Sequence, residues 1–282
     1  MVVVSLTTSP KRIMKCWPCL QSLLQQTLKP DLVVFNIPTE FGRTGEKYVI
    51  PLQVRRSVFV NRCGRDWGPG TKLIPTIPLL RKRGFPEDTR IVYLDEDIIY
   101  PPNMLETFCS MSADTVWTLH GLRAPSAYEI TKFLNQRGTR TERAAASIFI
   151  NKLWARPVHT GTPVDIVEAY AGVCTTLSMF KADFISHMER AICCDLQKFA
   201  DDITLSNYFA KHGIPRRIIY SDTLRWEHIR PLPWGLLEAD ALQNGGALSE
   251  TNVSRYIRLV RKLANAGEYY LNDSRSEKCL QD

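Results

Sequence analysis

Three consecutive acids, Asp95, Glu96 and Asp97, interrupt the apolar stretch IVYLDEDIIY at residues 91–100. Runs of Ile, Val and Tyr of this kind predict a buried strand. In an extended chain alternate side chains share one side, so we expect Asp95 and Asp97 to lie together, about 6–7 Å apart at Cα, with Glu96 pointing away. Two carboxylates this close repel each other unless a cation joins them. The pattern therefore predicts a site for Mg²⁺ or Mn²⁺, completed by phosphate oxygens and water; the alternative is pairing with Lys or Arg.

A second acidic pair, Asp201 and Asp202, stands in the segment ADDITLS. The pattern that follows predicts a helix ending at Gly213. At a helix start Asp201 is a suitable N-cap, and Asp202 is favourable beside the positive end of the helix dipole. That structural interpretation stays open beside a chemical one, because a carboxyl with a like-charged neighbour has a raised pKa and suits a general base.

The elements that must position these acids alternate along the first half of the chain. Short apolar strands separated by helices predict a mostly parallel sheet covered on both faces, with ligands outside the carboxyl ends of its strands. We expect strands at 2–8, 31–38, 57–61, 90–97 and 216–220, and helices at 13–27, 70–84, 181–192 and from 235 onward.

Bulk composition excludes a disordered or fibrous protein, since 44% of the 282 residues are hydrophobic and 23% are charged. The net charge of +7 favours anionic partners. We see no secretory leader and no apolar stretch near the ~20 residues of a membrane span, so we expect a cytoplasmic protein, with an anchor in a longer parent left open. The eight cysteines are expected to be reduced thiols.

Three segments together carry a family resemblance: SLTTSPKRI at 5–13, RDWGPGTKL at 65–73 and IVYLDEDIIYPP at 91–102. Their order and spacing resemble the nucleotide-sugar-dependent glycosyltransferases of the GT-A fold, a small microbial and viral-type group in particular. The resemblance implies an α/β fold with a Rossmann-like, mixed and mostly parallel sheet flanked by helices. It implies a domain over 1–230, with a nucleotide-binding half at about 1–110 and an acceptor half at 111–230. We expect residues 231–282 to form a helical extension packed on it.

The resemblance also implies roles for particular residues. Asp97 is the expected ligand of Mn²⁺ or Mg²⁺, Asp95 a second ligand or a contact to ribose or sugar, and Glu96 structural. His228, in RWEHIRP, completes the metal shell or contacts the diphosphate, unless it is only structural. The donor contacts are expected from Thr7, Thr8, Arg12, Asp66, Lys72 and Gly172. Asp66 is alternatively a tight-turn residue.

The implied reaction moves a sugar from a nucleoside-diphosphate donor, with UDP favoured, to a hydroxyl of a glycan or other acceptor. The resemblance places an acidic base at ADDITLS for an inverting reaction, and we favour Asp202 because Asp201 can be used as the cap. Retention of configuration is the alternative outcome. Asp165 and Glu168 are expected to contact sugar hydroxyls, and Gly172 to let a sugar approach the backbone.

Three alternatives belong to other classes. CWPC, Cys16–Cys19, matches the C-x-x-C of thioredoxin-like redox proteins, but a helix that begins at Pro10 would place Cys16 beyond the reach of the helix dipole. RYIRLVRKL, 255–263, could make the chain a basic module for nucleic acid or anionic lipid, although a packed terminal helix is the default. A pyrophosphorylase should open with a Gly-rich phosphate loop, which SLTTSPKR is not. We expect no nucleic-acid partner, and allow for peripheral contact with a membrane.

Overall fold

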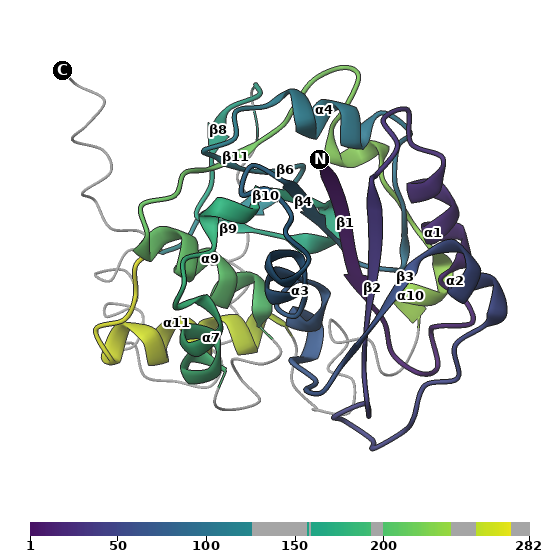
Figure 1. The fold of residues 1–282 in the computed structure, drawn as a ribbon. Coiled ribbons are helices and arrows are strands. Elements are labelled where there is room, and N and C mark those ends of the chain that lie inside the picture. The colour runs from purple at the N-terminus through teal and green to yellow at the C-terminus, as the bar shows by residue number, and fades with distance from the viewer. Residues whose placement is uncertain (126–156, 158, 193–199, 238–251, 272–282) are drawn as a thin grey trace.

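A computed structural model describes residues 1–125, 157, 159–192, 200–237 and 252–271. An eight-stranded sheet runs through the centre of this part of the chain (Figure 1), in the order β3-β2-β1-β4-β10-β6-β11-β8. Its strands are β1 Val2–Thr7, β2 Leu32–Pro38, β3 Phe59–Cys63, β4 Arg90–Tyr93, β6 Val116–Thr118, β8 Thr162–Pro163, β10 Val173–Thr176 and β11 Arg216–Ile218. Two small sheets pair β5 Ile98–Ile99 with β12 Arg230–Pro231, and β7 Gly121–Leu122 with β9 Ile166–Val167.

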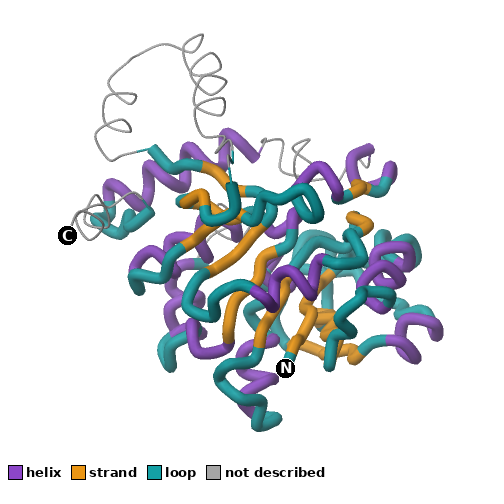
Figure 2. Tube along the Cα trace, turned by 90° about the horizontal axis from the view of Figure 1, so that it is seen from above, coloured by secondary structure: helices purple, strands orange, loops and turns teal. Residues whose placement is uncertain are grey.

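Helices lie on both sides of the strands, as the view from above shows (Figure 2). The α-helices are α1 Trp17–Leu24, α2 Leu52–Ser57, α3 Thr76–Lys82, α4 Met104–Ser110, α7 Phe184–Ala191, α9 Asp201–Lys211, α10 Pro233–Leu237 and α11 Asn252–Asn265. Short 3-10 turns are η1 Gly68–Lys72, η2 Ala169–Ala171, η3 Leu177–Met179 and η4 Trp226–His228.

Alternation along the central strands explains the two covered faces. In β1, Val2, Val4 and Leu6 join one apolar cluster, while Val3 joins the other. The first cluster includes side chains of α1, α2 and α4, and the second includes side chains of α3, α7 and α9. Because neighbouring residues of a strand point to opposite faces, an unbroken run of Val and Leu is what a sheet covered on both sides requires.

The direction of the strands confirms a mixed, mostly parallel sheet. β1 pairs in parallel with β2 and β4, and β2 with β3. β10 runs against both β4 and β6, and β8 runs against β11. The carboxyl ends of β1, β2, β3 and β4 therefore meet at one edge of the sheet, where ligands of such folds bind.

Several predicted boundaries are wrong. The helix expected at 13–27 begins at Trp17, because residues 10–15 form turns in which Arg12 and Ile13 donate to the Ser9 carbonyl. The helix expected at 70–84 is divided into η1 and α3. The strand expected at 90–97 ends at Tyr93, so the three acids lie in a loop and a turn rather than on a strand.

The helical segments near the end of the chain pack against the rest of the fold. Leu259, Val260 and Leu263 of α11 are buried in a third apolar cluster together with Leu122 and Ile203. The apolar side of α11 is thus buried inside the molecule. The predicted peripheral contact with a membrane depended on this side being exposed, so it is not supported by α11. Residues 238–251 and 272–282 lie outside the described part, so the predicted domain limits stay predictions. Among the described residues, no helix is both long and apolar enough to cross a membrane.

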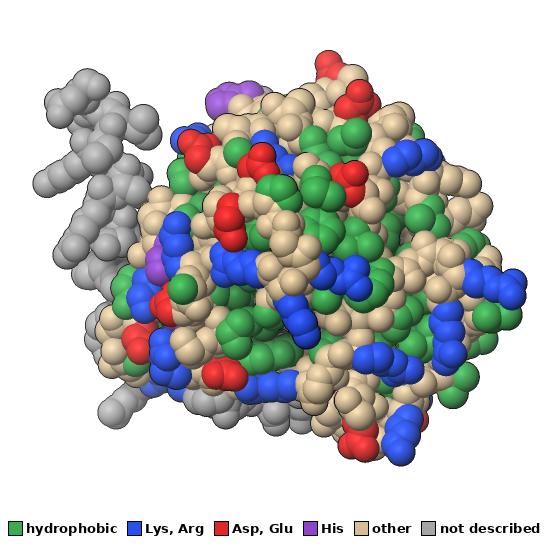
Figure 3. Space-filling view, viewed as in Figure 1, with side chains coloured by type: hydrophobic (Ala, Val, Ile, Leu, Met, Phe, Trp, Pro, Cys, Tyr) green, Lys and Arg blue, Asp and Glu red, His purple; other side chains and the backbone are tan. Residues whose placement is uncertain are grey.

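Charged side chains do not form a basic stripe on the face shown in Figure 3. Lys and Arg lie scattered there among acidic and apolar side chains. An extended basic surface is the electrostatic footprint of a nucleic-acid-binding protein. The face in view therefore gives the basic-module alternative no support.

Candidate functional site

A cavity of about 350 Å³ lies at the carboxyl ends of β1 and β4. Acids outnumber basic side chains among the described residues that line it. The acids are Asp66, Asp95, Glu96, Asp97, Glu168, Asp201 and Asp202, and the basic residues are Arg12, Arg43 and Lys72. The chain as a whole is basic, so this local excess of carboxylates marks a place where a cation is favoured.

The acid turn, Asp95–Asp97, brings three consecutive carboxyls to this cavity. Glu96 was expected to point away from its neighbours. Instead it is buried, and it accepts a hydrogen bond from Thr8 Oγ1 at 3.2 Å. The chain turns at 96–97 because Ile98 leaves the main sheet to pair with β12. A turn lets adjacent side chains share one side, which an extended strand does not allow.

Arg12 neutralises part of the acid turn. Its Nη1 lies 3.4 Å from Glu96 Oε1 and 3.4 Å from Asp97 Oδ2. Burial, Glu96 and Asp95 nevertheless raise the pKa of Asp97 to about 7, against the opposing effect of Arg12. Burial also raises the pKa of Glu96, again against Arg12. One guanidinium is therefore not enough for this turn, and a further cation would lower the free energy of its ionised form.

Lys72 links the acid turn to the second acidic pair. Its Nζ lies 2.6 Å from Asp95 Oδ1 and 3.2 Å from Asp201 Oδ2. Burial opposes its charge, but Asp201 and Asp95 outweigh that effect and raise the pKa of Lys72 well above its usual value. Ser5 Oγ and Asn36 Nδ2 both donate to the Lys72 carbonyl, which fixes the backbone from which this side chain extends. The predicted contact of Lys72 with phosphate stays a prediction.

The acidic pair of α9, Asp201 and Asp202, opens that helix, as predicted. The N-cap is Ala200, however, and Asp201 makes no capping hydrogen bond; its carboxylate turns to Lys72 instead. Asp202 Oδ1 accepts from Ala169 N at 3.1 Å, and its Oδ2 accepts from Tyr256 Oη at 3.2 Å. Burial and the neighbouring Asp201 raise the pKa of Asp202 well above its usual value. That direction is what a general base needs.

Thr7, at the end of β1, and Thr8 and Arg12, in the loop after it, line the cavity, and their contact with a nucleotide stays a prediction. Thr7 Oγ1 donates to Asn36 O at 2.8 Å, and Thr8 O accepts from Tyr48 Oη at 3.0 Å. Arg12 Nη2 also donates to Gly235 O at 3.2 Å. These contacts hold the loop against β2 on one side and against the C-terminal segment on the other.

Asp66 lines the cavity, and its hydrogen bonds to backbone amides are those of a turn residue. Its carboxylate accepts from Gly42 N at 2.6 Å and from Gly68 N at 2.7 Å. Asp66 thus ties the loop after β2 to the start of η1. The tight-turn alternative describes these contacts, and a role toward base or ribose stays a prediction.

Two predicted site residues, Gly172 and His228, are not among those that line the cavity. Gly172 has a φ of +78°, and a Cβ there would lie 3.4 Å from Met104 Sδ and from Phe108 Cε2. The glycine is needed for its backbone conformation and for packing on α4, and its expected contact with a sugar stays a prediction. His228 lies in η4, half-buried outside the cavity. Asp165, expected to meet a sugar, accepts from Ala124 N at 2.8 Å and is also outside the lining.

The C-terminal segment supplies cavity residues that the sequence analysis missed: Pro231, Leu232, Gly235 and Tyr256. Leu232 N donates to Asp97 O at 2.7 Å, which fixes this segment on the acid turn. A Cβ on Gly235 would lie only 2.4 Å from Asp97 Oδ2. Of these four residues, only Tyr256 stood in a segment that the sequence analysis had singled out, the basic helix RYIRLVRKL at 255–263.

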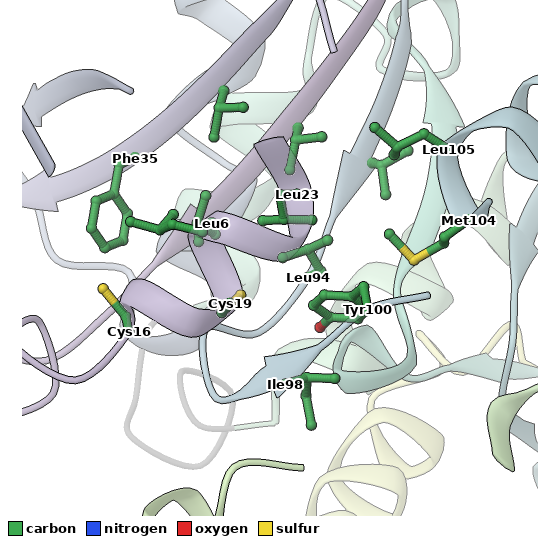
Figure 4. Close-up of a cluster of buried hydrophobic side chains, with 14 of the residues drawn as sticks. Leu6, Cys16, Cys19, Leu23, Phe35, Leu94, Ile98, Tyr100, Met104 and Leu105 are labelled. Carbon is green, nitrogen blue, oxygen red and sulfur yellow. The ribbon is translucent and has the colours of Figure 1, made fainter. Parts of the chain in front are cut away.

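The CWPC pair does not have the environment of a redox site. Contrary to expectation, Cys16 is the N-cap of α1, which would favour a thiolate. Both Cys16 and Cys19 are fully buried among apolar side chains such as Leu6 and Leu23 (Figure 4). Burial raises the pKa of the Cys16 thiol to about 12, so the thiol stays protonated. Cys63, Cys109 and Cys174 are also free, while Cys193, Cys194 and Cys279 lie outside the described residues.

The predicted metal ligands do not form a preassembled metal cage. Within the described ranges, no three His, Cys, Asp or Glu side chains are grouped so that they alone could hold a metal ion. Asp95 and Asp97 are each paired with a basic side chain, as the alternative for these acids foresaw. The raised pKa of Asp97 and its place in the cavity lining fit a cation whose remaining ligands would come from a diphosphate and water.

Comparisons with known proteins give distant structural similarity only. No protein-family model matches the chain, and neither does any curated protein. One similar structure is 4-diphosphocytidyl-2C-methyl-D-erythritol synthase, with a TM-score of 0.45 and 13% identity over 79% of this chain and 90% of that chain. A second is the structure of residues 1–349 of S. aureus TarS in complex with UDP, with a TM-score of 0.42 and 15% identity over 78% of this chain and 58% of that chain. A third is mouse xyloside xylosyltransferase 1, with a TM-score of 0.35 and 13% identity over 77% of this chain and 84% of that chain. Because a TM-score below 0.5 identifies no function, the site must be interpreted from its own side chains.

Proposed function

We propose that this chain is a glycosyltransferase that moves a sugar from a nucleoside-diphosphate donor to a hydroxyl acceptor. The observation that carries the proposal is one cavity that holds the loop after β1, the acid turn and the acidic pair of α9 together. The first two correspond to the segments that resemble GT-A enzymes, and the third supplies a carboxyl with a raised pKa. UDP is the nucleotide that the sequence resemblance favours.

In this proposal Asp97 and Asp95 of the acid turn would hold Mn²⁺ or Mg²⁺. The ion would supply charge neutralisation for the departing diphosphate. Arg12 lies on the acid turn, where its guanidinium would be within reach of phosphate oxygens of the donor. Lys72 keeps Asp95 in position and, against the effect of burial, favours the ionised form of Asp201.

Asp202 is the proposed general base of an inverting displacement. It takes the proton of the acceptor hydroxyl while that oxygen bonds to the anomeric carbon and the bond from this carbon to the diphosphate oxygen breaks. Two observations support Asp202 over Asp201. Asp201 is paired with a buried ammonium, whereas Asp202 is half-buried at the cavity and accepts hydrogen bonds from two neutral donors, Ala169 N and Tyr256 Oη.

The test is a thermal-unfolding panel of nucleoside diphosphates with and without Mn²⁺. A ligand at 100 times its Kd stabilises a protein by about 2.7 kcal/mol, which for a chain of this size raises Tm by several degrees. We expect UDP and Mn²⁺ together to raise Tm by more than the sum of their separate effects. Asp97→Asn should abolish this synergy, and Lys29→Gln, an exposed site far from the cavity, should retain it.

Additive effects of UDP and Mn²⁺ in the wild type would contradict the metal site. Stabilisation by CTP or UTP but by no diphosphate, together with release of pyrophosphate from a sugar phosphate mixture, would favour a nucleotidyltransferase instead. Transfer to a defined acceptor then distinguishes a transferase from a donor-binding protein.

A further inference from the structure

Helix α11 brings one side chain, Tyr256, into the cavity from a part of the chain far from the motifs. Its hydroxyl lies 3.2 Å from Asp202 Oδ2, across 54 residues of sequence. Tyr256 lines the cavity, whereas Leu259, Val260 and Leu263 of the same helix are buried in the apolar cluster. Tyr256 packs against that cluster and lies on the same face of α11 as these three residues, which follow it by three, four and seven positions. The buried face of the helix thus carries the aromatic side chain to the acidic pair.

The position of α11 relative to α9 is fixed at several points. Ile203 of α9 packs in the same cluster as Leu259 and Leu263. Beyond the end of α11, Asn207 Nδ2 donates to Glu268 O at 2.9 Å, and Asn207 Oδ1 accepts from Tyr270 N at 2.8 Å. These contacts link the helix that carries Asp202 to the segment after α11. The distance between Tyr256 and Asp202 is therefore set by packing and backbone hydrogen bonds.

Both oxygens of Asp202 have a donor, one from the backbone and one from this phenol. Ala169 N holds Oδ1 at 3.1 Å, and Tyr256 Oη holds Oδ2 at 3.2 Å. Two donors at different oxygens fix the carboxylate plane, while a remaining lone pair can face the cavity. A donor aimed at a carboxylate also stabilises its ionised form.

We propose that Tyr256 is a positioning residue that orients Asp202 for proton transfer, so that α11 is part of the catalytic machinery. This inference rests on the proposed role of Asp202 as the base. It assigns Tyr256 no contact with the donor nucleotide. Removal of the hydroxyl should therefore reduce turnover and leave donor binding unchanged.

The charge environment of Asp202 determines what a pH profile will report. Asp201 precedes it on α9, Lys72 faces it from η1, Asp95 from the acid turn and Glu168 from the segment before η2. The phenols of Tyr93, Tyr170 and Tyr256 are also near and are uncharged at neutral pH. A change from Tyr256 to Phe removes one donor and alters none of these charges.

The experiment compares Tyr256→Phe with Tyr269→Phe in the full chain, using hydrolysis or transfer of a UDP-sugar with Mn²⁺. Tyr269 packs at the edge of the same apolar cluster, and its hydroxyl donates to Pro125 O at 2.6 Å, outside the cavity. Loss of one hydrogen bond to a charged group corresponds to roughly tenfold or more in rate. We expect Tyr256→Phe to lower kcat by about tenfold and to leave the KM for the donor within twofold.

The acid limb of the kcat profile gives a readout that a purely structural role would not move. Loss of a donor to the carboxylate raises the pKa of Asp202, so the limb should move to higher pH in Tyr256→Phe and stay in place in Tyr269→Phe. A loss of folded enzyme that is the same at every pH lowers the whole profile and leaves the midpoint of the limb in place. In an Asp202→Asn background, Tyr256→Phe should have no further effect on kcat.

An unchanged kcat and an unmoved limb in Tyr256→Phe, with a wild type that turns over the UDP-sugar, would overturn the positioning role alone. Absence of UDP binding and of turnover in the wild type would instead overturn the proposed function, and the role of Tyr256 with it. A rise in donor KM without a change in kcat would show that Tyr256 contacts the donor, which also contradicts the proposal.

Discussion

The acid turn and the acidic pair of α9 contain the same residue types but receive different partners. In the turn, Glu96 and Asp97 point together and share the single guanidinium of Arg12. On the helix, adjacent side chains are about 100° apart, so Asp201 reaches Lys72 while Asp202 reaches Ala169 N and Tyr256 Oη. A turn concentrates charge, which suits a cation, whereas a helix separates two carboxyls into a paired one and one available for proton transfer.

Lys72 makes the two regions interdependent, because one ammonium lies within 3.2 Å of a carboxylate in each of them. The comparison is therefore best tested by changing each region separately and then the link between them.

The largest effect is expected from Asp202→Asn. Loss of a general base lowers turnover by about 10²–10⁴-fold, while the synergy of UDP and Mn²⁺ in thermal unfolding should persist. Rates of sugar transfer and Tm shifts on the same preparation check both parts. If Asp201→Asn abolishes transfer and Asp202→Asn does not, the assignment of the two helix carboxyls is reversed.

Lys72→Met should lower the free energy of unfolding by about 3 kcal/mol, since removal of one partner leaves a buried charge uncompensated. Asp201 is the affected carboxyl, because it is 6% exposed. Urea denaturation measures the effect, with the exposed Lys29→Met as the control, expected within about 0.5 kcal/mol of the wild type. Lys72→Met/Asp201→Asn should recover part of the loss; a double variant less stable than Lys72→Met would show that the ion pair is not the cause.

Gly235→Ala tests how tightly the acid turn is packed, because Gly235 lies against Asp97. The added Cβ would lie 2.4 Å from Asp97 Oδ2, so either α10 or Asp97 must move. We expect a loss of about 1–3 kcal/mol in stability, as for other overpacked sites, and a weaker Mn²⁺ effect. Gly64→Ala is the matched control, because a Cβ there meets nothing within 4 Å. Equal effects of the two substitutions would mean that Gly235 does not constrain Asp97.

The last test concerns the pH dependence of stability at Asp97. Its pKa is raised from 3.8 to about 7 in the folded chain. Between these values the folded state keeps a proton that the unfolded state has released, so this group makes stability fall as pH rises from about 4 to 7. Asp97→Asn removes the effect. The Tm of the variant minus that of the wild type should therefore increase over this range and level off above pH 7; a constant difference would contradict the raised pKa.

Sequence patterning predicted much of the scaffold. Runs such as VVVSL and LVVFNI can be buried on both faces only in a covered sheet, and this identified β1 and β2. It also placed the acids of residues 95–97 at the carboxyl edge of the sheet. Pattern did not predict where β4 ends, since Leu94 and Ile98 look alike in sequence and only the pairing of β5 with β12 separates them.

By itself the sequence determined which residue types are available: two acidic segments, a Thr-Pro loop and alternating apolar strands. Only the tertiary structure decided which of them meet, because contacts over large sequence separations depend on packing that no local pattern records. It turned Glu96 into the cavity and moved Gly172 out of its lining, onto α4. It also brought Tyr256 of α11 to Asp202, where side chains from the two ends of the chain complete one site.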